Sequence, residues 1–294
     1  MIIGYFADGP WSHRALDKLF ANGDVKIAFI CARYDQPDQI LKTLAEKKNI
    51  PFLVHPRINS DEFLNSIKHY RCDLFVSMSF NQIFRQRTID YPPLGTINCH
   101  AGKLPFYRGR NILNWALIND ENEFGITVHY MDEGIDTGDI ILQRCYPITD
   151  QDDYSTLLGR AYEGCADLLS DAVQLIHAGV VARTPQNGIH RMGFYCTARG
   201  QGDEYLNWDQ TSREVFNFVR AICPPGPSAR SWLGVEEIKI NRVEYLRDAP
   251  VYKGIPGAVL AMDGGGFLVK TRDSFVRVTH WECPVKPRVG VRLK

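Results

Sequence analysis

Residues 1–32 read MIIGYFADGPWSHRALDKLFANGDVKIAFICA, and this stretch decides the predicted fold of the N-terminal half. An apolar run at 1–7 has the length of a buried strand, a helical pattern covers 11–23, and a second apolar run follows at 25–32. A strand–helix–strand unit of this length favours two parallel strands joined by a right-handed crossover.

The same alternation continues along the chain. We therefore predict an α/β fold, a Rossmann-like open and mostly parallel sheet with helices on both faces. Functional loops are expected where strands end, at 8–11, 79–83 and 100–110. Further strands are expected at 50–56, 72–80, 95–100, 126–131 and 139–148, and further helices at 38–48, 60–69 and 155–179.

The character of the sequence changes near Arg199. RGQGDE at 199–204 is a Gly-rich charged linker, and a helical pattern follows within 209–222. Short strand-like runs separated by regular turn signals then predict a small, OB-like β-barrel. We assign residues 1–200 to a catalytic domain and residues 201–294 to a smaller β-rich domain.

Composition narrows the functional classes. The 34 Lys and Arg residues equal the 34 Asp and Glu residues, which argues against a bulk electrostatic grip on nucleic acid. Eight scattered cysteines without a C-x-x-C pair indicate reduced thiols. With no signal peptide pattern and no long apolar run, we expect a cytoplasmic protein with no membrane segment. No His/Cys/Asp cluster has metal spacing, G-x-G-x-x-G is absent, and His13 and His129 are interpreted as packing or surface residues.

The chemistry concentrates in NCHAGKLPFYRGR at 98–110 and DEGIDTGDI at 132–140. Asn98 and His100 lie two apart at the end of an apolar run, so both can project from one strand face. Asp136 follows in a Gly-flanked loop. An amide donor, an imidazole and a carboxylate suit an amine attacking an acyl group. Taken alone, Asn98 and His100 could instead cap a loop, with Asp136 a turn residue.

These strings resemble the signature of the N10-formyltetrahydrofolate-dependent formyltransferases, roughly N-x-H-x-S-x-L-P-x-Y-R-G and later D-x-G-D. The likeness covers nearly the whole chain and implies catalytic roles for Asn98, His100 and Asp136. Gly102 departs from the usual Ser, and Lys103 from the usual Leu. Asn111-Ile112 replaces a small residue and Pro, and PPGP only approximates PWPG.

The resemblance also implies binding residues and N10-formyltetrahydrofolate as co-substrate. It places the acceptor near the first strand end and the 103–110 loop, with Trp11, Lys103, Tyr107, Arg108 and Arg110 as candidates. Arg108 and Arg110 could each bind phosphate, but a structural brace is favoured for Arg108 and substrate binding for Arg110. The folate is expected between two loops, with Met78, Phe80, Asn81, Gln82, Ile83, Met131, Gly134, Ile135 and Asp139 as candidates.

The string YRGR-x-x-L-N-W at 107–115 is similar to that of sugar-nucleotide N-formyltransferases. This likeness implies a nucleotide-linked amino sugar as acceptor, as in lipopolysaccharide biosynthesis, and no nucleic-acid partner. The β-rich C-terminal domain indicates a possible homodimer, since such appended barrels often serve as dimer contacts. Three alternatives stay open: a methionyl-tRNA formyltransferase, a formyltetrahydrofolate hydrolase, and a folate-binding protein without transferase activity.

Overall fold

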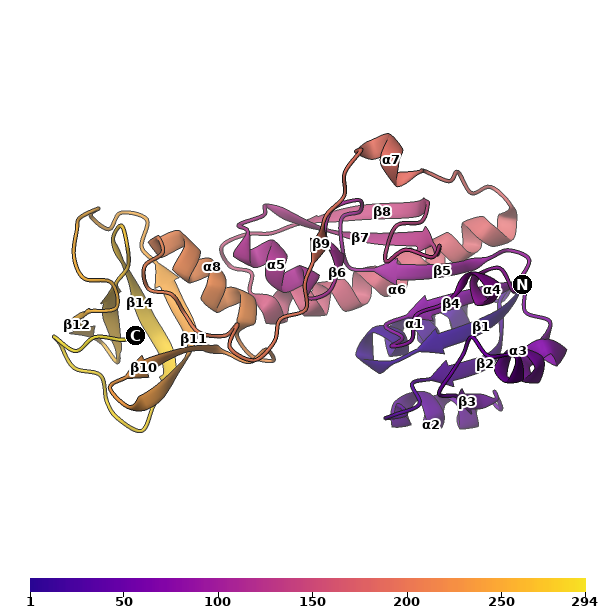
Figure 1. Cartoon of the computed structure of the whole chain (residues 1–294), viewed down its shortest axis with the longest axis horizontal. Coiled ribbons are helices and arrows are strands. Elements are labelled where there is room, and N and C mark those ends of the chain that lie inside the picture. Colours follow the sequence, from indigo (N-terminus) through magenta and orange to yellow (C-terminus); the bar gives the residue numbers. More distant parts are fainter. The chain divides into compact units, whose positions relative to one another are not determined.

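The computed structural model describes residues 1–294, which form two compact units (Figure 1). Unit 1 comprises residues 1–109, 125–146 and 159–196. Unit 2 comprises residues 110–124, 147–158 and 197–294. The predicted domain boundary at residue 200 stays a prediction.

The main sheet has seven strands in the order β3-β2-β1-β4-β5-β7-β8. The first five strands in that order pair in parallel, and β5 pairs with β7 antiparallel. The predicted α/β class with a mostly parallel sheet is therefore confirmed. The strands are β1 (Ile2–Ala7), β2 (Lys26–Ala32), β3 (Phe52–Val54), β4 (Leu74–Met78), β5 (Thr96–His100), β7 (Glu123–Tyr130) and β8 (Ile140–Pro147).

Capping residues fix several helix starts. The Asp38 carboxylate accepts from the backbone N–H groups of Ile40 and Leu41, and the Ser60 hydroxyl accepts from Phe63. Pro10 occupies the first turn of α1, so this helix begins two residues before the predicted start. The helices are α1 (Gly9–Ala21), α2 (Gln39–Lys47), α3 (Asp61–Ile67) with the 3₁₀ turn η1 (Lys68–Tyr70), α4 (Gln86–Ile89), α6 (Tyr154–Ala178) and α7 (Gln186–Ile189).

An aromatic cluster packs one face of the sheet in unit 1. The Phe6 ring meets those of Phe29, Phe75 and Phe84 edge-on, with centroids 5.0–5.6 Å apart. Such buried rings supply much of the apolar area that stabilises a domain of this size. This packing fixes the strands whose carboxyl ends carry the polar loops.

Unit 2 contains a five-stranded antiparallel sheet in the order β10-β11-β14-β13-β12. The chain end closes it, because Leu293 bridges to Leu233 of β10 and Arg292 bridges to Ala258 beside β12. The chain end thus covers part of both edges of the sheet, as expected of a small barrel. The elements are α5 (Ile112–Ile118), α8 (Ser212–Ile222), β10 (Ala229–Leu233), β11 (Glu236–Tyr245), β12 (Val259–Asp263), β13 (Gly266–Lys270) and β14 (Phe275–Glu282).

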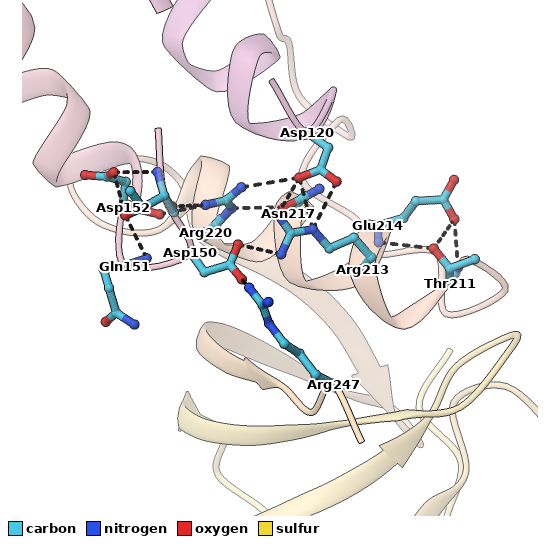
Figure 2. A network of polar contacts seen from close by, with 11 residues as sticks. Asp120, Asp150, Gln151, Asp152, Thr211, Arg213, Glu214, Asn217, Arg220 and Arg247 are labelled. Atoms are coloured by element: carbon cyan, nitrogen blue, oxygen red, sulfur yellow. Dashed lines mark hydrogen bonds and ion pairs between the residues drawn. The ribbon is translucent and has the colours of Figure 1, made fainter. Parts of the chain in front are cut away.

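Three arginines of unit 2 form an ion-pair network (Figure 2). Arg213 bonds Asp120 through Nε at 3.0 Å and Asp150 through Nη1 at 2.6 Å. Arg247 reaches the other oxygen of Asp150. The buried Arg220 donates to the carbonyls of residues 149 and 152. The network ties α8 and the barrel to the segment before α6.

No helix combines the length and apolar character needed to span a membrane.

Candidate active site

Asn98 and His100 lie on β5, and both face the same side because they are two residues apart. Across the antiparallel pairing, Asn98 is opposite His129 and His100 is opposite Thr127 of β7. His100 is only 8% exposed. The strand end is therefore a buried polar site.

The hydrogen bonds of His100 define its tautomer. Its Nε2 lies 2.7 Å from the Tyr107 carbonyl oxygen, which can only accept, so Nε2 carries a proton. Its Nδ1 faces Asp136 Oδ2 at 3.6 Å. Burial lowers the pKa of His100, although the Asp136 charge opposes this effect. Near neutral pH, Nδ1 is thus an unprotonated nitrogen that can take up a proton beside a carboxylate.

Asp136 is held as an ionised carboxylate. Its Oδ2 accepts from the Gly109 N–H at 2.9 Å, and its Oδ1 lies 3.6 Å from His129 Nε2. Burial alone would raise the pKa of Asp136. The charge of His100, the contact and charge of His129 and the Gly109 N–H together overcome that effect and lower it to about 2.

His129 belongs to this cluster, although the sequence analysis assigned it to packing or the surface. It is 2% exposed, and its Nδ1 lies 2.7 Å from the Tyr130 carbonyl oxygen, so that nitrogen is protonated in the neutral ring. Its Nε2 lies 3.4 Å from Asn98 Nδ2 and 3.6 Å from Asp136 Oδ1, so the ring lies between the amide and the carboxylate.

Gly102 explains one departure from the family pattern. A Cβ atom at this position would lie 2.4 Å from both His100 Nε2 and the Tyr107 carbonyl oxygen. A serine there would force the imidazole or the loop to move. The imidazole position and its bond to the Tyr107 carbonyl therefore depend on glycine.

Gln186 is a second residue that the sequence analysis missed. It is 4% exposed, and its side chain bonds the backbone of the Asp136 loop and the guanidinium of Arg108. Gln186 lies 50 residues beyond Asp136, in a stretch without periodicity. Nothing in the local sequence therefore indicates its contact with the Asp136 loop.

The predicted folate residues divide into supporting and accessible groups. Met78 is 1% exposed, and Phe80 packs on the Phe6 ring at 5.6 Å. Gln82 holds the segment after β3, donating to the His55 carbonyl and accepting from the Ile58 N–H. Ile83 and Ile135 are 60% and 54% exposed, so their side chains are free to cover an apolar ring.

The remaining predicted folate residues are polar or lie near the strand ends. Asn81 donates to Asp35. The Gly134 N–H bonds Asp132, and the Asp139 carbonyl accepts from Tyr130. Met131 packs on the aromatic cluster of unit 1.

The predicted acceptor residues are distributed over both units. Trp11 is half-buried, and its ring meets Tyr162 edge-on at 4.7 Å. The Lys103 backbone lies against Gly125, and Tyr107 is 8% exposed. Arg108 is engaged by Gln186, an arrangement that favours its interpretation as a brace. Arg110 belongs to unit 2.

Acidic side chains dominate the neighbouring strand ends. Arg33 pairs with Asp35 at 2.7 Å and with Asp8 at 3.3 Å. Asp38 accepts from the Gly9 N–H and lies 2.8 Å from His13 Nε2. Two carboxylates thus pair with the Arg33 guanidinium and a third pairs with His13, so this edge offers little attraction for a polyanion.

No group of three or more His, Cys, Asp and Glu side chains could hold a metal ion. The cluster instead presents an oriented amide, a neutral imidazole and an ionised carboxylate beside one another. Such a set can remove a proton from a nucleophile and stabilise negative charge on an acyl oxygen. Such chemistry on an α/β fold suits an acyl-group transferase.

Comparison with known proteins identifies the family. Residues 3–173 match the Formyl transferase family, and residues 200–292 match the Formyl transferase C-terminal domain. The chain belongs to this family and is a formyl-transferring enzyme. The predicted formyltransferase family is therefore confirmed.

The proteins to which this chain is similar carry names that refer to different acceptors. A methionyl-tRNA formyltransferase of Syntrophus aciditrophicus is 32% identical over 94% of this chain and 89% of its own. Among solved structures, WlaRD, described as a sugar 3N-formyl transferase, gives a TM-score of 0.69 at 21% identity, covering 98% and 99% of the two chains. An N-formyltransferase of Helicobacter canadensis, solved with folinic acid and dTDP-3-aminofucose, gives 0.68 at 20% identity, covering 96% and 99%.

Proposed function

We propose that this enzyme transfers a formyl group from N10-formyltetrahydrofolate to the primary amine of a nucleotide-linked amino sugar. The observation that carries formyl transfer is the cluster of Asn98, His100 and Asp136. The folate is proposed as the donor because the exposed Ile83 and Ile135 lie on two loops at strand ends. The structures of WlaRD and the Helicobacter enzyme, both solved with folate compounds, support this choice.

The chain's own groups would act in a simple sequence. The neutral amine attacks the formyl carbon, and the formyl oxygen becomes negative. The second N–H of the Asn98 amide is available to that oxygen, since the first faces His129. His100 Nδ1 takes the proton that the amine loses, and Asp136 stabilises the imidazolium. The same proton goes to N10 when the bond between the formyl carbon and N10 breaks, so His100 returns to its starting state.

Charge favours a small acceptor. The protein has no net charge, and at the strand ends near Trp11 Arg33 is paired with two carboxylates, Asp8 and Asp35. A tRNA would need a cationic surface there, since phosphate contacts dominate such binding. The YRGR-x-x-L-N-W string supports the same choice.

Initiator methionyl-tRNA is the second candidate acceptor. The observation that favours it is the identity with methionyl-tRNA formyltransferases, which extends over both domains of this chain. Arginines and lysines of the barrel could contact phosphates, although acidic residues separate them.

The experiment is a mass-spectrometric assay with N10-formyltetrahydrofolate, a panel of UDP-, dTDP-, GDP- and CMP-linked amino sugars, and charged initiator tRNA. A gain of about 28 Da on one sugar nucleotide supports the proposal. Formylation of the tRNA alone would replace the sugar by the second candidate. Formate release without any acceptor would indicate a hydrolase.

A further inference from the structure

All hydrogen-bonding positions of the Gln186 carboxamide are used within unit 1. Its Nε2 donates to the carbonyl of Asp136 at 2.8 Å and to that of Gly138 at 2.9 Å. Its Oε1 accepts from Arg108 at 2.6 Å through Nη2 and at 3.2 Å through Nε. A buried amide satisfied on both ends fixes the position of every group it contacts.

Asp136 needs such external support. Its φ of +54° lies in the left-handed region, which is unfavourable for a residue with a Cβ atom. Backbones of this kind persist only when the surroundings determine them. Gln186 holds the Asp136 carbonyl, and the Gly109 N–H holds its carboxylate. Two anchors from different segments thus fix one residue.

The same anchors connect the two loops of the site. Arg108, bound to Gln186, is followed directly by Gly109, which binds the Asp136 carboxylate. The residue before Arg108 is Tyr107, whose carbonyl holds His100 Nε2. The Arg108 N–H in turn bonds the carbonyl of Phe194, the residue before β9 (Tyr195–Cys196). The strand β9 pairs with β6 (Arg108–Gly109).

We propose that Gln186 is a positioning residue of the formyl-transfer reaction. It holds the Asp136 loop against Arg108, so that the carboxylate lies beside Nδ1 of His100. This inference rests on the proposed roles of His100 and Asp136, and adds a residue that acts through Asp136.

The first test is Gln186→Met, which keeps the side-chain length and removes every polar atom. Turnover of the best acceptor should fall about 10- to 100-fold, because small displacements of a catalytic group cost that much. KM for both substrates should change little. The control is Asn187→Ala, since this neighbour is exposed and should turn over like the wild type.

A double-mutant cycle separates positioning from a general loss of structure. In an Asp136→Asn background, Gln186→Met should slow turnover less than threefold, because Gln186 is proposed to act through the Asp136 carboxylate, which this background lacks. The full 10- to 100-fold loss in that background would overturn the proposal. If the Met variant does not fold, Gln186→Glu gives the same comparison, since it retains an oxygen for Arg108 and loses the amide donors.

The outcomes distinguish this inference from the function on which it rests. If Asp136→Asn turns over normally, the proposed catalytic roles fail. If Asp136→Asn is slow while folded Gln186→Met or Gln186→Glu is as fast as wild type, only the positioning role fails.

Discussion

Two polar clusters of this molecule contain similar side chains in different surroundings. In unit 1, Asp136 lies among buried imidazoles, is 12% exposed, and has one backbone N–H as its only close hydrogen bond to the carboxylate. In unit 2, Arg213 is 29% exposed, and its guanidinium bonds Asp120 and Asp150 (Figure 2). The first cluster leaves a basic nitrogen and an amide N–H available. The second uses its donors on carboxylates, as expected of a structural contact.

This difference indicates that a candidate catalytic cluster is better recognised by burial and unused hydrogen-bonding groups than by its charge. Burial strengthens electrostatic interactions and shifts pKa values, whereas exposed ion pairs contribute little. The two clusters should therefore respond differently to mutation: activity should depend on the first cluster and not on the second.

The largest effect should come from the catalytic cluster. His100→Ala and Asp136→Asn should each lower kcat by about 10²- to 10⁴-fold, the contribution of general acid–base catalysis. Circular dichroism should show both variants folded. Steady-state kinetics with the acceptor found by mass spectrometry makes the measurement. Near-normal kcat in either variant would contradict the assigned roles.

The next effect concerns the pKa of His100. In Asp136→Asn, His100 should titrate at lower pH than in the wild type, because the carboxylate that favours its imidazolium is gone. NMR titration of labelled histidines measures this, with His100→Ala assigning the signal. An unchanged pKa would mean that the two side chains are not coupled.

The same pair should make stability rise with pH on the acid side. For His100, whose folded-state pKa is lowered, the unfolded chain binds the extra proton, so stability is lost as pH falls below the ordinary value of 6.5. For Asp136, whose folded-state pKa is about 2, stability is complete above the ordinary value of 3.8 and is lost as pH falls toward 2. Urea unfolding of Asp136→Asn should lack the second loss.

The sequence predicts those parts of this site that depend on the local spacing of residues. Asn98 and His100 share a strand face because side chains alternate along a strand, and the order of strands and helices predicts a parallel sheet. His129 could not be placed, because its position opposite Asn98 depends on the register of two strands. The sequence did hold an indication that His129 faces the site, since Thr127 and His129 are two residues apart and share one face of their strand.

Long-range contacts set the remaining features. Gln186 reaches Asp136 from a segment that follows a 25-residue helix, and nothing in its neighbours predicts that contact. The short helix α5 and the β6–β9 pair also depend on partners far along the chain. Closure of the barrel by Arg292 and Leu293 likewise requires knowledge of both edge strands.

A smaller effect is expected in the ion-pair network. Arg213→Met should lower the free energy of unfolding by about 1–2 kcal/mol, because Asp120 and Asp150 lose their shared partner while part of the site stays hydrated. Turnover of a small acceptor should stay within twofold of the wild type. Urea unfolding monitored by tryptophan fluorescence makes the measurement. A large loss of kcat with unchanged stability would reverse the comparison.

The smallest effect should come from Arg247. Its side chain is 74% exposed, so water and salt screen its contact with Asp150, and Arg213 still neutralises that carboxylate. Arg247→Ala should therefore cost a few tenths of a kcal/mol in low salt, and this cost should vanish near 1 M NaCl. Arg213→Met is the matched comparison in the same titrations. An equal or larger cost for Arg247→Ala would mean that the exposed arginine, rather than the half-buried one, stabilises the network.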